Sequence, residues 1–406
     1  MAITDLTNTT WNMTPKEQFI NQLNELSDAI NEKAKTSGKM TISKMAEAVQ
    51  NIASYEQGYE AGSADALKDV TTLKGYFDTT KSTSGFFKNY TGASVEGLIK
   101  YGDTGNVIDM QYMFSGCTSL TSIPELDTSK VTKMNGMFKS CSSLTTIRLL
   151  DTSSVIEMQY MFQGCSNLTS IPLLDTSNVT WLPEMFVSCT SLTTIPLLNT
   201  SKVTNMCAMF QNCSSLTSIP ALDTNNVTTM RQMFLDCENL TTIPLLNTSK
   251  VTNMRSMFSG CTSLTTIPLL DTSKVTDTSG MFFRCKSLTS IPALDTSKVT
   301  DMRQMFYVCS SLTTIPALDT SSVTGSNYLN DIFAGCSSLK TILMYGMRVN
   351  FSISSSTQFE ASDLVTILNN LATVTSTRTL TMGTTNLAKL TDEQKAIATN
   401  KGWTLA

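Results

Sequence analysis

Residues 120–141 read LTSIPELDTSKVTKMNGMFKSC, and variants of this stretch recur along most of the chain. Met-Phe pairs begin every 24 residues without a slip, at Met113, Met137, Met161, Met185, Met209, Met233, Met257, Met281 and Met305. Cysteines keep the same spacing from Cys117 to Cys309, and a tenth unit containing Cys336 follows after a three-residue insertion. A fixed period of this length is typical of a solenoid, in which each unit buries its apolar face against its neighbours.

The apolar residues of the second half of the unit are spaced by three, three and four, as in Val131, Met134, Met137 and Cys141. This spacing predicts a short helix. The Thr- and Ile-rich first half predicts a short strand, which a proline in eight units limits to two to four residues. Its inward side chains are expected to be the isoleucine, as in Ile123, and the Leu or Ala two residues later, as in Leu149, Leu173 and Ala221. The expected fold is an α/β solenoid with one short parallel strand and one short helix per rung.

The columns of identical residues admit more than one interpretation. Two methionine columns are interpreted as core filler rather than a soft metal site, because Met packs irregular core space. The cysteines are expected to be buried free thiols, since side chains stacked in one direction are poorly placed for a disulfide. Disulfides or a metal are the alternatives, and Cys207 lies off the column at an expected surface position.

A further column is mostly acidic: Asp103, Asp127, Asp151, Asp175, Asn199, Asp223, Asn247, Asp271, Asp295 and Asp319. Helix caps and Asx turns accept Asn as readily as Asp, so the two asparagines favour that role. Calcium is the alternative, although it normally requires several oxygens for each ion.

The composition excludes several classes of function. Charged residues make up 15% of the 406 and the net charge is −4, so no basic field for nucleic acid or anionic membrane is expected. Histidine is absent, which removes the commonest general base and metal ligand. No run of 18 apolar residues and no secretory leader is found, so membrane insertion is not expected. We expect no enzyme, no cofactor and no metal site.

The motif MFxxCxSLTxIPxLDTSxVTxM resembles the BspA-like leucine-rich repeats of bacterial surface proteins and of phage tail proteins. The resemblance spans residues 103–343, which are expected to form ten solenoid units. It implies short strands, short helices and a binding or adhesive role without catalysis. Residues 71–102 are expected to be a degenerate capping repeat.

Both ends of the chain differ from the repeats. Residues 344–406 are expected to form a C-terminal cap, with one helix from Asp363 to Leu371 and another after a capping box of Thr391 and Gln394. Residues 1–70 are expected to be helical, with a two-heptad apolar seam between Lys16 and Lys35. The segments ITDLT, TISKMAEAVQNI and GYEAG resemble the attachment ends of phage proteins, which implies a region for attachment or oligomerisation.

The leading interpretation is a phage virion tail protein, fibre-like or receptor-binding. Its rod would bind a host-surface protein or glycan, and residues 1–70 would bind other tail proteins or self-associate. The alternative is a bacterial cell-surface adhesin of the BspA-like family. The expected location is therefore the virion tail, or else the bacterial surface.

A comparison of the repeats indicates where binding takes place. Exposed strand positions are nearly always Thr-Ser or Thr-Thr, whereas positions beside the Met-Phe pair vary widely. Aromatic and arginine side chains are common at binding hot spots and suit sugars as well as proteins. The expected binding residues are Tyr112, Tyr160, Trp181, Glu184, Arg231, Arg255, Phe283, Arg284, Arg303 and Tyr307. The alternative is neutral drift on a solvated helix face.

Overall fold

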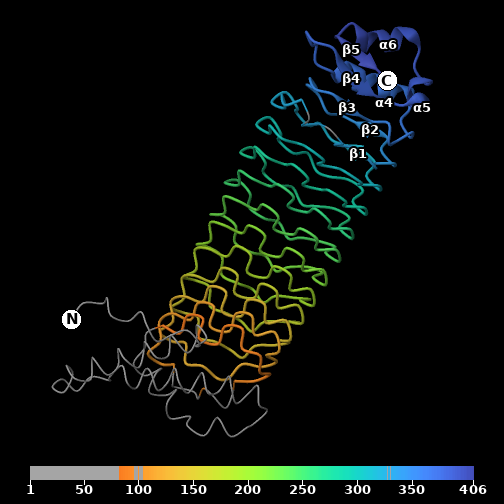
Figure 1. The fold of residues 1–406 in the computed structure, drawn as a ribbon. Helices are drawn as coiled ribbons and strands as arrows, with labels where there is room; N and C mark the ends of the chain where they lie inside the picture. Colours follow the sequence, from red (N-terminus) through yellow and green to blue (C-terminus); the bar gives the residue numbers. More distant parts are fainter. Residues whose placement is uncertain (1–81, 96–98, 100–103, 327, 330) are drawn as a thin grey trace, which may run out of the picture.

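The computed structural model describes residues 82–95, 99, 104–326, 328–329 and 331–406. The helical region expected at residues 1–70 and part of the capping repeat expected at 71–102 lie outside the described residues. The repeats form a rod of stacked rungs that ends in a C-terminal cap (Figure 1). Parallel bridges join neighbouring rungs at one position of the unit, from Ser82–Asp109 to Asp277–Asp301. The 24-residue period therefore predicts the solenoid correctly.

The helices expected in the second half of each unit are wrong. In their place the backbone makes overlapping turns: the N–H of Met137 donates to the carbonyl of Met134 at 3.2 Å, and that of Lys139 to Gly136 at 3.0 Å. The alternate N–H groups donate to carbonyls of the next rung, as from the Gly136 N–H to the Gln159 carbonyl at 2.8 Å. Left-handed residues recur at two positions, Gly136 (φ 57°) and Ser140 (φ 61°), and an α-helix cannot contain them.

The strands expected in the first half are found only in the last two solenoid rungs. There β1 (Thr314–Ile315) pairs in parallel with β2 (Thr341–Ile342), with Thr314 opposite Thr341. Earlier rungs are joined on this face by isolated backbone hydrogen bonds, such as the one from the Thr169 N–H to the Thr145 carbonyl at 3.1 Å. Most earlier units carry the proline, which cannot donate to a ladder, so a continuous sheet does not extend along this face.

The prediction of which side chains face inward in the first half of the unit is also partly wrong. Ile123 is buried as expected, but Leu149 is 72% exposed, Leu173 is 63% exposed, and Ala221 is exposed too. The next residue faces inward instead, so Leu150 is only 3% exposed. Three buried residues per unit are thus spaced by three, which is the repeat of an extended backbone with three residues per turn.

The core is made of columns of identical side chains. Phenylalanine rings stack nearly parallel from Phe87 to Phe333, with centroids 5.5 Å apart between Phe87 and Phe114 and 6.0 Å apart between Phe306 and Phe333. The ten cysteines of the repeat column are buried free thiols, as expected. Each donates to the carbonyl of the phenylalanine one rung earlier, as from Cys165 Sγ to the Phe138 oxygen at 3.0 Å. The thiol column therefore adds a hydrogen bond between each pair of rungs.

The acidic column makes Asx turns, but no helix follows them to be capped. Asp127 Oδ1 accepts from the Ser129 hydroxyl at 2.7 Å and from its N–H at 3.1 Å. Asn199 accepts from the Ser201 N–H at 3.2 Å in the same way, which explains why asparagine is tolerated. The hydroxyl and then the N–H of Ser129 lower the pKa of Asp127. This half of the prediction is confirmed, and the helix-capping half is wrong.

A buried threonine follows each acidic position, and the sequence reasoning did not identify it. Thr200 Oγ1 donates to the Asp223 carbonyl of the next rung at 2.8 Å, whereas the Thr248 hydroxyl is buried without a partner. Both residues are 1% exposed. The column thus contains matched threonines with and without an inter-rung hydrogen bond.

This pair gives a testable prediction. Thr200→Val removes a buried hydrogen bond and should lower the free energy of unfolding by about 1 kcal/mol. Valine has the same shape as threonine, so Thr248→Val only removes a buried hydroxyl that has no partner. It should leave the free energy of unfolding unchanged or raise it. Urea denaturation of both variants measures the difference. Equal losses would contradict the assignment of the hydrogen bond.

The C-terminal cap closes the rod with a three-stranded parallel sheet in the order β3-β4-β5. The strands are β3 (Phe351–Ser352), β4 (Arg378–Thr381) and β5 (Trp403–Leu405). The helices are α4 (Ala361–Asn370), α5 (Thr384–Leu387) and α6 (Asp392–Thr399). The expected helix at 363–371 is α4, shifted by two residues at its start, and the Thr391–Gln394 capping box before α6 is confirmed.

Candidate ligand-binding site

The expected binding residues lie on the face that we call the turn face, the exposed side chains from the bridge position, which comes just before the first Met, to the Cys of each rung. Four of them occupy left-handed positions: Tyr112, Tyr160, Glu184 and Arg284, with φ between 54° and 60°. A left-handed side chain leans over the corresponding residue of the next rung. A Cβ added to Gly136, for example, would collide with the ring of Tyr112. The ring of Tyr112 therefore occupies space that the absence of a side chain at Gly136 leaves open.

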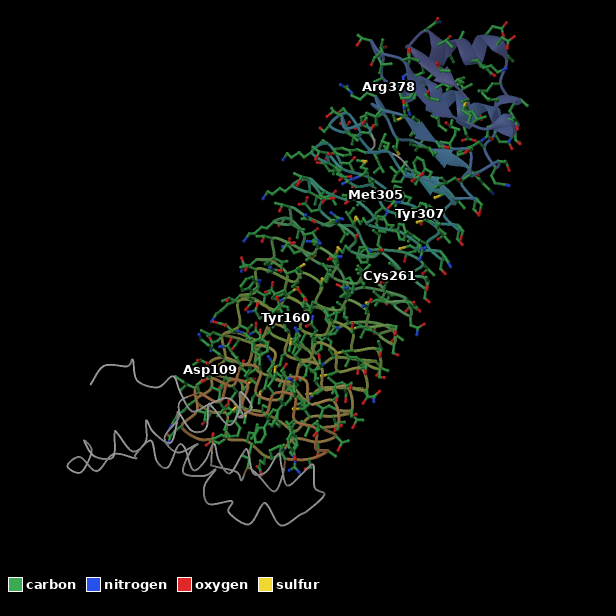
Figure 2. The ribbon with its side chains drawn as sticks, in the orientation of Figure 1. Asp109, Tyr160, Cys261, Met305, Tyr307 and Arg378 are labelled. Atoms are coloured by element: carbon green, nitrogen blue, oxygen red, sulfur yellow. The ribbon has the colours of Figure 1, made fainter. Side chains whose placement is uncertain are left out.

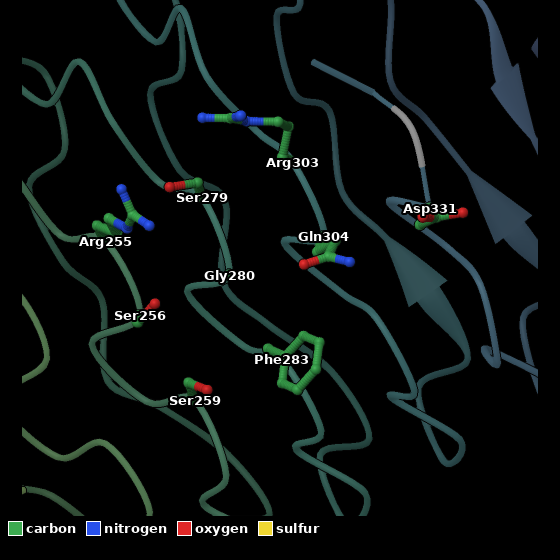
Figure 3. A pocket seen from close by; sticks show the side chains of 9 residues that line it. All are labelled: Arg255, Ser256, Ser259, Ser279, Gly280, Phe283, Arg303, Gln304 and Asp331. Atoms are coloured by element: carbon green, nitrogen blue, oxygen red, sulfur yellow. The ribbon is translucent and has the colours of Figure 1, made fainter. Parts of the chain in front are cut away.

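The structure brings Arg255, Phe283 and Arg303 together around one hollow of about 520 Å³ (Figure 3). Six further residues line it: Ser256, Ser259, Ser279, Gly280, Gln304 and Asp331. The hollow exists because two successive rungs carry Ser and Gly at positions where other rungs carry larger side chains. In Figure 3 the two arginines lie on the side of Ser279, and Asp331 lies on the opposite side.

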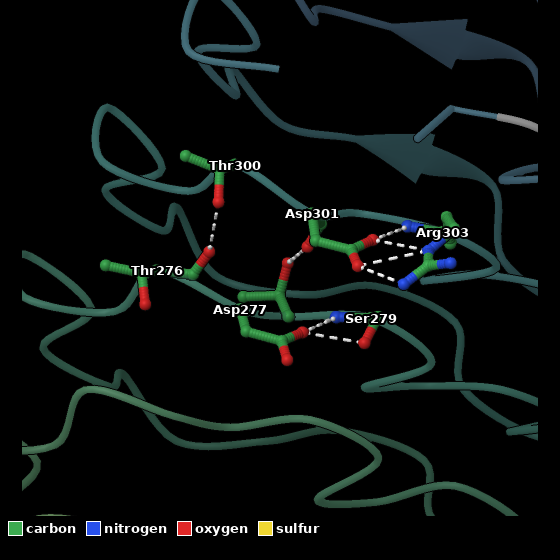
Figure 4. A network of polar contacts seen from close by, with 7 residues as sticks. Thr276, Asp277, Ser279, Thr300, Asp301 and Arg303 are labelled. Atoms are coloured by element: carbon green, nitrogen blue, oxygen red, sulfur yellow. Dashed lines mark hydrogen bonds and ion pairs between the residues drawn. The ribbon is translucent and has the colours of Figure 1, made fainter. Parts of the chain in front are cut away.

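The two arginines have different surroundings. Arg303 Nη2 lies 2.6 Å from Asp301 Oδ2 (Figure 4). The Arg303 guanidinium also lies 5.2 Å from the centroid of the Tyr328 ring. The hydrogen bond and the charge of Asp301 raise the pKa of Arg303. Arg255 is exposed, and among the described residues its guanidinium makes no hydrogen bond or ion pair. Within the described part of the chain, the hollow thus holds one guanidinium paired with a carboxylate and one that is unpaired.

The ring of Phe283, which lines the hollow, belongs to an aromatic pair with Tyr307. The rings of Phe283 and Tyr307 stack with centroids 4.9 Å apart and planes 7° apart. The guanidinium of Arg284 lies 5.1 Å from the centroid of Phe283. Three expected binding residues are therefore in mutual contact, and the position of Phe283 is fixed by two neighbours.

A second group of expected residues lies several rungs away, nearer the N-terminal end (Figure 2). Burial, followed by the charges of Glu184 and Tyr112, raises the pKa of Tyr160. Lys139 Nζ lies 5.3 Å from the centroid of the Tyr160 ring. Trp181 is 47% exposed and joins the bridge ladder. This group does not line the hollow described above.

Arg231 does not line the hollow and lies nearer the second group, since Cys207 is within reach of the charges of both Arg231 and Glu184. It is exposed and near Cys207, since its charge acts to lower the pKa of that thiol against the larger opposing effect of burial. Cys207 itself is half-buried rather than on the open surface. The backbone N–H of Arg231 donates to Thr229 Oγ1 at 3.4 Å, and its guanidinium makes no hydrogen bond or ion pair with the described residues.

Sequence reasoning missed the small residues and Asp331 that shape the hollow. It also missed a second hollow of about 650 Å³ on the opposite edge of the unit, where Leu245 (71% exposed) and Leu269 (64% exposed) lie beside Asp223 and Asp271. The adjacent leucine pairs in the sequence were the available signal, because two neighbouring residues rarely both face inward.

Two kinds of feature are absent from the described residues. No group of three or more cysteine or carboxylate side chains there is placed to hold a metal ion. Among the same residues, no helix has the length and apolar character needed to cross a membrane.

Several solved leucine-rich-repeat structures are similar to this chain. A leucine rich cell surface protein from Faecalibacterium prausnitzii is 23% identical, with a TM-score of 0.36, and the match covers 65% of this chain and 83% of that one. A leucine rich repeat protein from T. pallidum is 22% identical, with a TM-score of 0.28 and coverage of 45% and 72%. An internalin from Listeria monocytogenes is 14% identical, with a TM-score of 0.24 and coverage of 79% and 89%.

Comparison with curated proteins gives no match. A family described as "Mycoplasma protein of unknown function, DUF285" matches in four overlapping segments, residues 18–170, 81–195, 184–290 and 239–345. These segments cover well over half of the chain and include every rung from the first Met-Phe pair onward. The chain therefore belongs to the DUF285 family of BspA-like repeats.

Proposed function

We propose that this protein is a ligand-binding surface protein of the adhesin type, and that it binds through the turn face without catalysis. The observation that carries the proposal is the hollow formed by Arg255, Phe283 and Arg303 on the most variable face of an otherwise uniform rod. Distinct side chains at fixed places are what specific recognition requires. The membership in a BspA-like family favours a surface adhesin over a virion protein.

The opposite choice, binding through the threonines of the first half of the unit, has less support. We call these exposed residues the threonine face. Many of their hydroxyls already donate to the preceding rung, as from Thr241 Oγ1 to the Thr217 carbonyl at 3.3 Å. Thr289 Oγ1 does the same with Thr265 at 3.4 Å. A face of repeated, already bonded hydroxyls offers little to distinguish one ligand from another.

Attachment assays test the proposal. Trp181→Ala combined with Tyr160→Ala, or Arg255 and Arg303 changed together to Ser, should lower binding of the labelled full chain to cells by about tenfold or more. The melting temperature should stay close to that of the parent, because these residues are exposed or half-buried. Flow cytometry on a panel of epithelial and bacterial cells gives the measurement.

The matched control changes the threonine face, with Thr193, Thr241 and Thr289 replaced by Ser. These variants keep a hydroxyl for each inter-rung bond and should bind as the parent does. If this set loses attachment and the turn-face sets keep it, the site belongs on the threonine face.

The virion interpretation depends on the N-terminal resemblance, which lies outside the described residues. A virion tail protein would use the same turn face, with residues 1–70 bound to other tail proteins. The cell panel separates the two functions. Attachment to epithelial cells supports the adhesin, whereas attachment confined to bacterial cells supports the tail protein.

A further inference from the structure

We propose that the hollow between Arg255 and Asp331 binds a sugar that carries a carboxylate group. This inference deepens the proposed function, on which it rests, by naming the chemistry of the ligand. The hollow is concave and its volume of about 520 Å³ lies within the range of small-ligand sites. It lies on the turn face, whose backbone is fixed on both sides by inter-rung bonds such as the one from the Ser256 N–H to the Ser279 carbonyl at 2.9 Å.

The lining suits a hydroxyl-rich ligand better than a protein side chain. Protein hot spots fill apolar pockets with aromatic or aliphatic anchors. Among the described lining residues Phe283 has the one apolar side chain, and its ring is already held between Tyr307 and Arg284. The side chains of Ser256, Ser259 and Gln304 make no hydrogen bond with described residues. Their donors and acceptors are therefore available to the hydroxyls of a sugar.

The charged side chains of the hollow favour a ligand that carries a carboxylate. Arg303 is neutralised by Asp301, and Ser279 already donates to Asp277 Oδ1 at 2.6 Å. Arg255 has no such partner among the described residues, and a guanidinium binds a carboxylate with two parallel hydrogen bonds. At the other side, the carboxylate of Asp331 makes no hydrogen bond or ion pair with the described residues and can accept from sugar hydroxyls. A neutral sugar would leave Arg255 without a partner, and a simple anion would make no use of Asp331.

Calorimetric titration of the full chain with tetragalacturonate tests this inference, because its methyl ester keeps every hydroxyl and removes only the charge. We expect the acid to bind and the ester to bind at least about tenfold more weakly, which is the weight of a charged hydrogen bond. Arg255→Gln should weaken binding of the acid to the same degree and leave the ester unaffected. Higher salt concentration should also weaken binding of the acid, because salt screens the attraction between the carboxylate and the guanidinium.

Arg231→Gln is the matched control, since Arg231 holds the same position one rung earlier and does not line the hollow. It should bind tetragalacturonate like the parent. Ser259→Tyr should block the hollow, and the rung should accept it because Tyr307 occupies the same position two rungs later. Equal binding of acid and ester, no binding of the acid at all, or equal losses in the Arg255 and Arg231 variants would each overturn the inference.

The two proposals fail in different ways. If tetragalacturonate does not bind but Arg255→Gln still abolishes attachment to cells, the hollow binds a protein or another ligand. The surface-binding function then stands and the sugar inference is wrong. If no turn-face variant affects attachment, the proposed function itself fails.

Discussion

Deleting one complete unit, residues 216–239, should give a folded and slightly shorter protein. The deletion joins rungs whose columns still match, so that Phe210 would stack on Phe258 and Cys213 would precede Leu240 in the same register. Each rung contacts only its neighbours, so only one interface is lost. We expect the melting temperature to change by less than about 5 °C, measured by circular dichroism.

Deleting half a unit, residues 216–227, should abolish folding of the rod. All later rungs would then be shifted by twelve residues, and Phe234 would fall at the position of Leu222. The stacked rings and the thiol-to-carbonyl bonds would be lost at that junction. Comparable melting of the two deletion variants would show that the columns do not stabilise the fold.

The period predicted the solenoid and its core columns, but not the backbone within a rung. Val131, Met134, Met137 and Cys141 are all fully buried, so the selection of inward residues in the second half was right. Their spacing is shared by a helix face and by a series of overlapping turns, and periodicity alone cannot separate the two. The distinguishing signal was glycine at two fixed columns, as in Gly136 and Gly164, because recurrent glycine indicates positive φ.

The candidate site was only partly predictable for a similar reason. The sequence predicts three of its residues, Arg255, Phe283 and Arg303, because they are aromatic or arginine side chains at variable positions. The hollow, however, is formed by small residues, namely Ser256, Ser259 and Gly280. Whether such a gap is open depends on the direction of the side chains around it. The left-handed turns fix that direction, and the sequence reasoning had assigned a helix there.

The rod should be unstable in alkali because of its cysteine column. Burial raises the pKa of Cys165, Cys213 and Cys336 to about 12, from an ordinary value of 9.0. It raises that of Cys189, Cys237, Cys261 and Cys309 well above 9.0. The unfolded chain therefore loses these protons above pH 9 while the folded chain keeps them. Stability is fully present below pH 9 and falls as the pH rises toward 12.

Each such thiol should lower the free energy of unfolding by about 1.4 kcal/mol per pH unit in this window, so seven thiols together produce a steep loss. Urea midpoints measured from pH 8 to 11 should fall sharply above pH 9. Cys213→Ala with Cys237→Ala should give a shallower fall, smaller by about two protons, while tyrosine and lysine ionisation contributes equally to both proteins. An unchanged slope in the double variant, or rapid reaction of the column thiols with a thiol reagent in the native protein at pH 8, would show that they are not buried in the core.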